Sequence, residues 1–416
     1  MSTYTTLLES PFDQISPEDD SFIEELLEVA QLFRPFSEGL DDFIAAHGYE
    51  GDMTDAAAKV GFIRGVFRRA GMSPPREIGK WYSQNQPIRR DTAFQICFAF
   101  GLDGVQTDEF FRRVFVRERS FDCHRVQEAV YYYCLNNGLD YASAQDILSQ
   151  LPEPPRGLQP GQSVVFTNSI VESLNRIDSR ATLVRYLSDN IALFSHNNAT
   201  AYDYIRRLWG QVSGENGLVA REFRRFYSGG EDAATDTRRK SLRKGTAGAP
   251  VSTMELYLGI FQLDKKRVYA LHSDRTLKPL LECLRAEVKD SFPDRQGIEG
   301  VLAGRTLSYE RVRKLLILLA FYVFWAKRRL ERGSYEAGAH DGARCVDEIN
   351  RILFDAGYPE LYVGNPYDWL FLYAARQFDP LATFREIWQS LLDRAAADTG
   401  KPSPGDDVIQ SLHDTE

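Results

Sequence analysis

The sequence has few cysteines and no two of them close together. Its five cysteines are spread over 416 residues without a CxxC motif, so neither a disulfide framework nor a zinc knuckle is expected. The longest apolar run, residues 315–326, is shorter than the roughly twenty residues of a membrane-spanning helix. The first twenty residues lack the basic and then apolar order of a secretory signal. We therefore expect a cytoplasmic protein without a membrane segment, in which residues 315–326 form a buried helix.

The sequence also lacks the common motifs of catalysis. The phosphate-binding GxxxxGK[ST], dinucleotide-binding GxGxxG, zinc-protease HExxH and nucleophile-elbow GxSxG patterns do not occur. The six histidines are scattered. Cys123 and His124 are adjacent, a spacing that faces different sides of a helix and suits one metal ion poorly. We therefore predict that the protein is not an enzyme and has no metal site or cofactor.

Helical periodicity runs through most of the chain. Apolar residues recur at spacings of three and four, whereas the period-two alternation of strands is nearly absent. This pattern predicts an all-α protein. Proline and glycine gather at residues 151–163, and polar and small residues at 228–252, which marks candidate breaks between modules. The predicted domains are a helical module, a helical middle segment, a C-terminal helical module and a polar tail, at residues 20–151, 162–228, 253–392 and 395–416.

The first and third modules share sequence patterns at nearly one offset. DEFFRRVF at residues 108–115 matches DEINRILF at 347–354, with an offset of 239. Residues 129–151 match residues 369–391 at an offset of 240, with four identities. Two matches at almost the same offset predict a tandem duplication, with the C-terminal module as a divergent copy. Amphipathic helices also resemble each other by pattern alone, so coincidence remains the alternative.

Charge is distributed unevenly along the chain. The net charge of −9 argues against a general coat for nucleic acid. Residues 1–58 hold fourteen acidic residues and one basic residue, whereas residues 59–90 hold eight basic residues and one acidic residue, a net charge of +7. Such a change of sign points to an anionic partner for the basic segment. A solvated helix face would have the same composition, and both interpretations remain open.

The basic segment contains a short helix with two different faces. Pro74 and Pro75 are tolerated in the first turn of a helix, so a helix is expected over residues 73–82 with Ser73 at its start. Helical spacing puts Ile78 and Trp81 on one side. The apolar pair is expected to dock on the core while cations on the opposite side face outward.

The order of elements around this helix matches a known class of DNA-binding domain. A helix ending at Gly71 is followed by the short helix, a polar turn at residues 83–87 and a helix ending in FAFGLD. Over about residues 40–111 this order resembles the Cro/C1-type, XRE-like helix-turn-helix domain. The resemblance implies an N-terminal lambda-repressor-like helix-turn-helix bundle, followed here by further helical bundles.

The basic and polar residues of this segment are the candidate DNA contacts. Arg76 and Lys80, four residues apart on the outer side of the short helix, are assigned to base readout in the major groove. The other candidates are expected to contact phosphates, through side chains or the helix N-terminus: Arg68, Arg69, Ser73, Gln84, Asn85, Arg89 and Arg90. An ordinary helical bundle with a basic surface remains the alternative for the segment.

These residues predict a sequence-specific protein of duplex DNA, a transcriptional regulator of prokaryotic or phage type. Its partner would be double-stranded DNA, with a protein partner or self-association through the C-terminal module. The alternative is a helical interaction or scaffold protein that does not bind DNA. The acidic residues 1–20 would either compete with DNA for the basic segment or only solvate a helix packed at residues 21–33.

Overall fold

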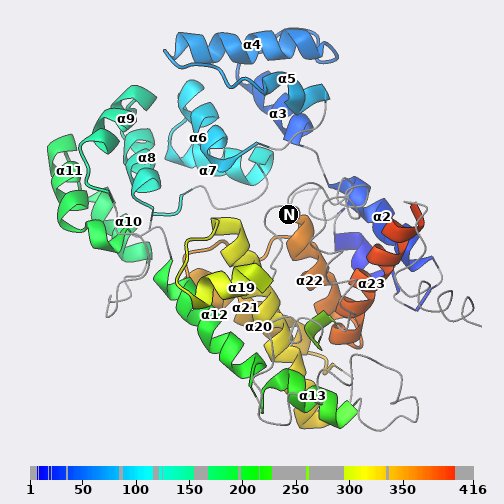
Figure 1. Cartoon of the computed structure of the whole chain (residues 1–416). Helices are drawn as coiled ribbons and strands as arrows, with labels where there is room; N and C mark the ends of the chain where they lie inside the picture. Colours follow the sequence, from blue (N-terminus) through cyan, green and yellow to red (C-terminus); the bar gives the residue numbers. More distant parts are fainter. Residues whose placement is uncertain are drawn as a thin grey trace, which may run out of the picture. The chain divides into compact units, whose positions relative to one another are not determined.

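The computed structural model divides the chain into two compact units. Unit 1 consists of Met1–Phe33, Ala201–Leu353 and Glu360–Glu416, and unit 2 of Arg34–Thr200 and Phe354–Pro359 (Figure 1). The structure describes residues 7, 9–16, 18–19, 21–33, 36–83, 88–115, 121–123, 125–153, 167–194, 198–214, 216–226, 259–261, 295–333 and 337–398. These residues form helices and no strand, which confirms the all-α prediction. The predicted modules divide the chain differently, because residues 1–33 join unit 1.

Unit 2 is a bundle of short helices joined by tight turns. Its helices are α3 (Phe36–Ala46), α4 (Ala56–Arg69), α5 (Ile78–Ser83), α6 (Arg90–Ala99), α7 (Gly104–Phe110), the π-helix η2 (Phe111–Phe115), α8 (Val126–Asn136), α9 (Tyr141–Ser149), α10 (Thr167–Asn175), α11 (Arg180–Asp189) and the 3-10 helix η3 (Ile191–Leu193). Gly71, Gly101 and Gly138 follow α4, α6 and α8 with positive φ, the conformation in which glycine ends a helix without strain.

Aromatic side chains fill the core of unit 2. The ring of Phe94 on α6 lies 4.8 Å from that of Phe111, 5.4 Å from that of Phe121 and 5.3 Å from that of Tyr131. All four residues are buried. Because these rings come from α6, η2, α8 and the segment between them, one cluster holds the middle of the bundle together.

Unit 1 is built around one long buried helix. Its helices are η1 (Ser10–Asp13), α2 (Phe22–Leu32), α12 (Ala199–Val212, which starts at the boundary with unit 2), α13 (Leu218–Phe226), α19 (Arg295–Leu302), α20 (Tyr309–Arg332), α21 (Asp341–Asp355), α22 (Pro366–Arg376) and α23 (Pro380–Asp398). Residues 312–326 of α20 are all buried, which confirms the buried helix expected at 315–326. Among the described residues no helix has the length and apolarity to cross a membrane.

The N-terminal segment is an integral part of unit 1. Phe12 and Ile15 are buried, and the ring of Phe12 lies 5.3 Å from that of Trp369 on α22. The hydroxyl of Tyr373 donates a hydrogen bond of 2.9 Å to the backbone carbonyl of Ile15. The expectation of a loose acidic arm at residues 1–20 is therefore wrong for the described part of it, because its apolar side chains pack into a core.

A buried carboxylate anchors unit 2 at the third residue of α8. Glu128 is 1% exposed and accepts two hydrogen bonds from Arg90, from Nε at 2.9 Å and from Nη2 at 2.7 Å. It also accepts one from the backbone N–H of Asp122, six residues earlier, at 2.7 Å. We call Arg90, Glu128 and the Asp122 N–H the unit 2 latch. It ties the start of α6 to the start of α8.

Unit 1 contains the same arrangement at the third residue of α22. Asp368 is fully buried and accepts two hydrogen bonds of 2.7 Å from Arg313, plus one of 3.0 Å from the backbone N–H of Tyr362, again six residues earlier. This is the unit 1 latch. Asp368 and Tyr362 each lie 240 residues after Glu128 and Asp122, and α22 begins and ends 240 residues after α8.

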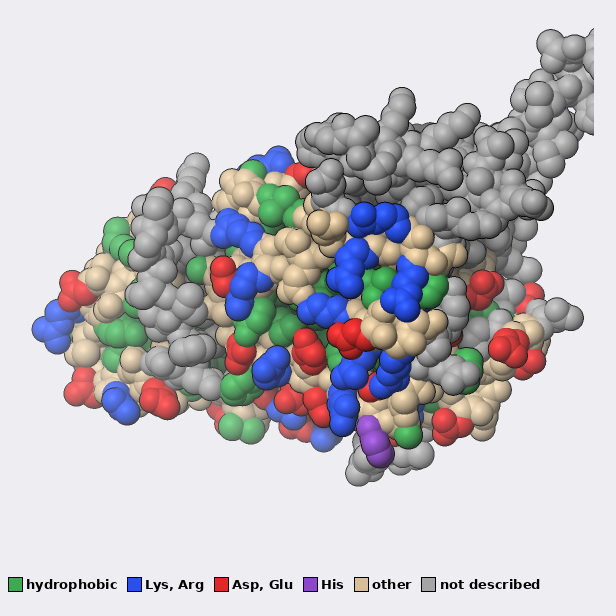
Figure 2. Space-filling model, turned by 90° about the horizontal axis from the view of Figure 1, so that it is seen from below, with side chains coloured by type: hydrophobic (Ala, Val, Ile, Leu, Met, Phe, Trp, Pro, Cys, Tyr) green, Lys and Arg blue, Asp and Glu red, His purple; other side chains and the backbone are tan. Residues whose placement is uncertain are grey.

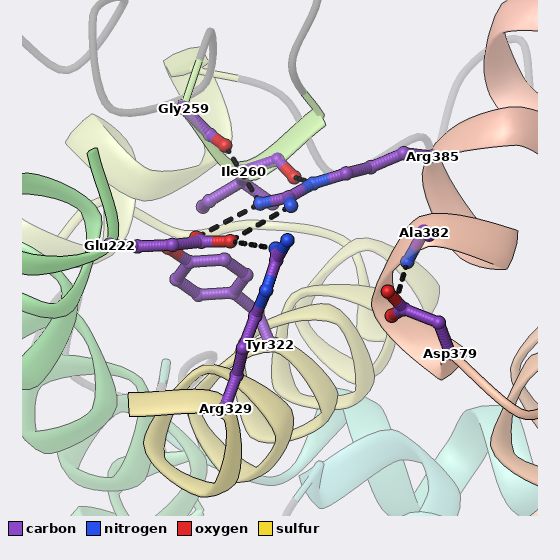
Figure 3. Close-up of polar contacts among 8 residues, drawn as sticks. All are labelled: Glu222, Gly259, Ile260, Tyr322, Arg329, Asp379, Ala382 and Arg385. Atoms are coloured by element: carbon purple, nitrogen blue, oxygen red, sulfur yellow. Dashed lines mark hydrogen bonds and ion pairs between the residues drawn. The ribbon is translucent and has the colours of Figure 1, made fainter. Parts of the chain in front are cut away.

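A second buried carboxylate joins three helices of unit 1 (Figure 3). Glu222 on α13 accepts hydrogen bonds from Arg385 of α23 at 2.9 and 3.0 Å, from Arg329 of α20 at 2.6 Å and from the hydroxyl of Tyr322 at 2.9 Å. Burial by itself would raise the pKa of Glu222, but the two guanidinium groups outweigh it, so the pKa lies below the usual glutamate value. The charged form is therefore the form that holds the helices together.

Candidate nucleic-acid interface

Helix α4 presents part of the basic segment to solvent. Asp55 caps the helix by accepting hydrogen bonds from the backbone N–H groups of Ala57 at 2.8 Å and Ala58 at 3.0 Å. Ile63, Val66 and Phe67 are buried, and this fixes the rotation of the helix. The opposite side carries Arg64, Arg68 and Arg69, all exposed. Arg68 and Arg69 thus lie on the surface, as their predicted role requires.

Helix α5 is shorter than the sequence analysis predicts. It begins at Ile78, whereas Ser73 and both prolines that follow have no helical conformation. Each proline disfavours the helical conformation of the residue before it, so two prolines in succession keep Ser73 and Pro74 extended. The expectation that Ser73 starts a helix is therefore wrong. Ser73 is exposed, but it offers no helix N-terminus to a phosphate.

The buried side of α5 is the one that the spacing predicts. Ile78 is fully buried, Trp81 is 2% exposed, and the ring of Phe36 on α3 meets the Trp81 ring edge-on at 5.8 Å. Lys80, on the same helix, is exposed. Arg76 is also exposed but lies in the turn before the helix. The two residues assigned to base readout are therefore both on the surface, on different types of backbone.

The neighbours Arg89 and Arg90 have different surroundings. Arg89 precedes α6 and is exposed. Arg90 belongs to the unit 2 latch, and its guanidinium lies 5.4 Å from the centre of the Phe94 ring and 5.2 Å from that of the Phe111 ring. A phosphate contact by Arg90 would have to break the pair with Glu128. We therefore remove Arg90 from the set of candidate contacts and assign it to the fold.

Lys59 is also used inside unit 2. Its ammonium donates a hydrogen bond of 2.7 Å to the carboxylate of Asp41 on α3 and lies 4.5 Å from the centre of the Tyr82 ring. Burial first, and then the charge of Asp41, raise the pKa of the Tyr82 hydroxyl. Lys59 and Asp41 neutralise each other, so Lys59 adds no net charge to the surface.

Six exposed cations of the basic segment remain, and we call them the α4–α5 surface. They are Arg64, Arg68, Arg69, Arg76, Lys80 and Arg89. The exposed acid within the same range is Glu77, so the net charge is +5. Gln84 and Asn85, which were expected to follow the DNA backbone, lie outside the described residues. The sequence analysis did not single out Arg64, although its position at the outer side of a helix is visible in the spacing.

A cavity in unit 2 does not extend this surface. It has a volume of about 510 Å³ and is lined by residues of α7, η2, α8 and α10. Arg112 pairs with Asp108 and Arg113 pairs with Glu109, each four residues earlier. The cationic side chains at this cavity are therefore matched by acids, in contrast to those of the α4–α5 surface. Within the described part of the chain no group of three or more histidine, cysteine or acidic side chains is placed to hold a metal ion.

Comparisons of the chain with protein-family models, with curated proteins and with solved structures found no match. The resemblance of residues 40–111 to XRE-like domains stays a prediction. Eight residues separate the end of α4 from the start of α5, whereas helix-turn-helix motifs join their two helices by a turn of about three to four residues. The chemistry of the surface is thus a firmer basis for a function than the motif.

Proposed function

We propose that the protein binds duplex DNA through the α4–α5 surface of unit 2 and acts as a transcriptional regulator. The observation that carries this proposal is the net charge of +5 on exposed side chains that follow one another over two helices and a turn. Phosphates of duplex DNA attract such a surface, because each neutralised phosphate releases condensed counterions. Five of the six cations are arginines, whose planar guanidinium groups match phosphate geometry.

Sequence preference would come from Arg76 and Lys80. Both are exposed next to the buried anchors Ile78 and Trp81, so the backbone that carries them is held in place. Arginine and lysine are the common partners of guanine O6 and N7 in the major groove. Arg68, Arg69 and Arg89 would contact phosphates and fix the register.

Selection from a random duplex library tests the proposal. The full chain is expected to enrich a sequence, and replacing both Arg76 and Lys80 by alanine should weaken binding to it by roughly 2 to 6 kcal/mol, at about 1 to 3 per base contact. The fold should be retained, since neither side chain is buried. Failure to enrich any sequence, or equal binding by the double variant, would reject sequence-specific recognition.

We also infer that α7 to α9 of unit 2 and α21 to α23 of unit 1 are copies of one ancestral segment. The support is the pair of latches: each places a buried carboxylate at the third residue of a helix, with one bidentate arginine and the N–H six residues earlier. Superposing experimental coordinates of residues 121–149 on 361–389 tests it. Helices that run in a different order or direction would contradict it.

A further inference from the structure

A second row of cations lies on helix α13 of unit 1. Arg221, Arg224 and Arg225 are exposed, and their spacing of three and four residues places them on one side of the helix. The opposite side is buried and contains Val219 and Glu222. Because Glu222 is fully engaged by Arg329 and Arg385, its charge is not available to neutralise the exposed row.

The C-terminal end of α20 extends this row. Arg225 donates a hydrogen bond to the backbone carbonyl of Leu330, so the end of α13 lies against the end of α20. Lys327 is exposed there, and the side chains of Arg328 and Arg332 are 30% and 37% exposed. Figure 2, seen from the side on which α13 lies in Figure 1, shows lysine and arginine side chains gathered on this face. We call the six residues the α13–α20 surface.

Internal partners neutralise only part of this charge. Asp341 is buried and pairs with Arg332 at 2.5 Å and Arg328 at 3.7 Å, and Glu331 is an exposed acid on the same helix. Six cations against these two acids leave a net charge of +4. The ends of α13 and α20 each contribute roughly half a negative charge. About +3 therefore remains after helix capping, so a structural role does not account for the whole cluster.

We propose that the α13–α20 surface is a second DNA-binding surface, which contacts the phosphate backbone of the duplex without reading bases. This extends the DNA binding proposed for unit 2 and depends on it. Five of the six cations are arginines, which suit phosphate oxygens through paired N–H donors. Arg224 also donates to the side chain of Asn216 at 3.2 Å, so the neighbouring amide orients a cation. Contacts of this kind fix position and add affinity that does not depend on sequence.

The test measures binding of the full chain to a fluorescent duplex over a series of salt concentrations. One variant carries Arg221→Gln, Arg224→Gln and Lys327→Gln. The matched control carries Arg176→Gln, Arg185→Gln and Arg207→Gln, which remove the same charge from exposed positions on α10, α11 and α12. A third variant, R221K/R224K, keeps the charge, and circular dichroism checks that each variant is folded.

The α13–α20 variant should reduce the slope of log K against log salt by about 2 to 3, at roughly 0.9 per phosphate contact, and weaken binding ten- to a hundredfold near physiological salt. The loss should be equal for preferred and unrelated duplexes. The lysine variant and the control should keep the wild-type slope. A wild-type slope for the α13–α20 variant would overturn the second surface, as would loss only on the preferred duplex.

A parallel variant of the α4–α5 surface, R68Q/R69Q/R89Q, separates the two proposals. If that variant binds as the wild type does while the α13–α20 variant is impaired, the site proposed on unit 2 fails and the surface on unit 1 stands. Absence of any duplex binding by the wild type would overturn both. Binding of anionic lipid vesicles in place of duplex DNA would also overturn both and would assign the cations to a membrane surface.

Discussion

Replacing Arg90 by glutamine is expected to destabilise unit 2, whereas the same change at its neighbour Arg89 is not. Arg90 supplies two of the hydrogen bonds that hold the 1% exposed carboxylate of Glu128. Glutamine would leave that carboxylate buried without its main counter-charge. Arg89 is exposed at the start of α6, where its replacement removes a surface charge only.

The magnitude follows from what remains around Glu128. Breaking a buried ion pair by removing one partner costs about 3 to 5 kcal/mol. Arg125 still donates to Glu128 at 3.1 Å, and the N–H of Asp122 still donates at 2.7 Å. We therefore expect a loss near the lower end, about 3 kcal/mol, which lowers the folding equilibrium constant by about two orders of magnitude. For Arg89→Gln we expect a change within about 0.5 kcal/mol.

Urea unfolding followed by ¹⁹F NMR of fluorotryptophan-labelled protein measures this loss in unit 2 alone. The chain has five tryptophans, and Trp81 belongs to unit 2 whereas the others belong to unit 1. Trp81→Phe assigns the reporting resonance. A loss below about 1 kcal/mol for Arg90→Gln, or equal losses for both variants, would refute the assignment of Arg90 to the fold.

Three further outcomes are expected. Phe12→Ala should destabilise unit 1 by about 3 to 5 kcal/mol in urea unfolding, since Phe12 is 3% exposed; a neutral effect would show that the N-terminal segment is not packed. The lowered pKa of Glu222 means that unit 1 loses stability as pH falls through and below the usual glutamate range, and Glu222→Gln should remove that part of the pH dependence; an unchanged profile would exclude Glu222 as its source. Burial raises the pKa of the Cys134 thiol to about 12, so in a Cys283→Ser background thiol reagents at pH 8 should label Cys134 only on unfolding; rapid labelling of native protein would contradict its burial.

Local pattern predicted the parts of the fold that depend on neighbouring residues. The helical class, the buried helix within α20 and the inward side of α5 all follow from apolar spacing over a few turns. The start of α5 was wrong because tolerance of proline in a first turn was weighed without the constraint that each proline puts on the residue before it. Residue-by-residue conformational restrictions would have corrected it.

Long-range pairing explains the other differences. The partner of Arg90 lies 38 residues away, and Phe12 packs on helices more than 350 residues later in the chain. Nothing in the sequence around either residue names its partner. A signal for the latch was present, however: Glu128 interrupts an apolar helix, and Asp368 occupies the corresponding position at the repeat offset of 240. An acid shared by two apolar helices in a repeat indicates a buried pair.

The most direct test of the central claim is the affinity of the full chain for duplex DNA as salt is varied. If the six exposed cations of the α4–α5 surface contact phosphates, log K should fall with log salt at a slope of about −4 or steeper. The variant R68Q/R69Q/R89Q should lower that slope by about 2 to 3 while leaving unfolding by urea unchanged. Binding that is absent at low salt, or a slope that this variant does not alter, would contradict DNA binding through unit 2.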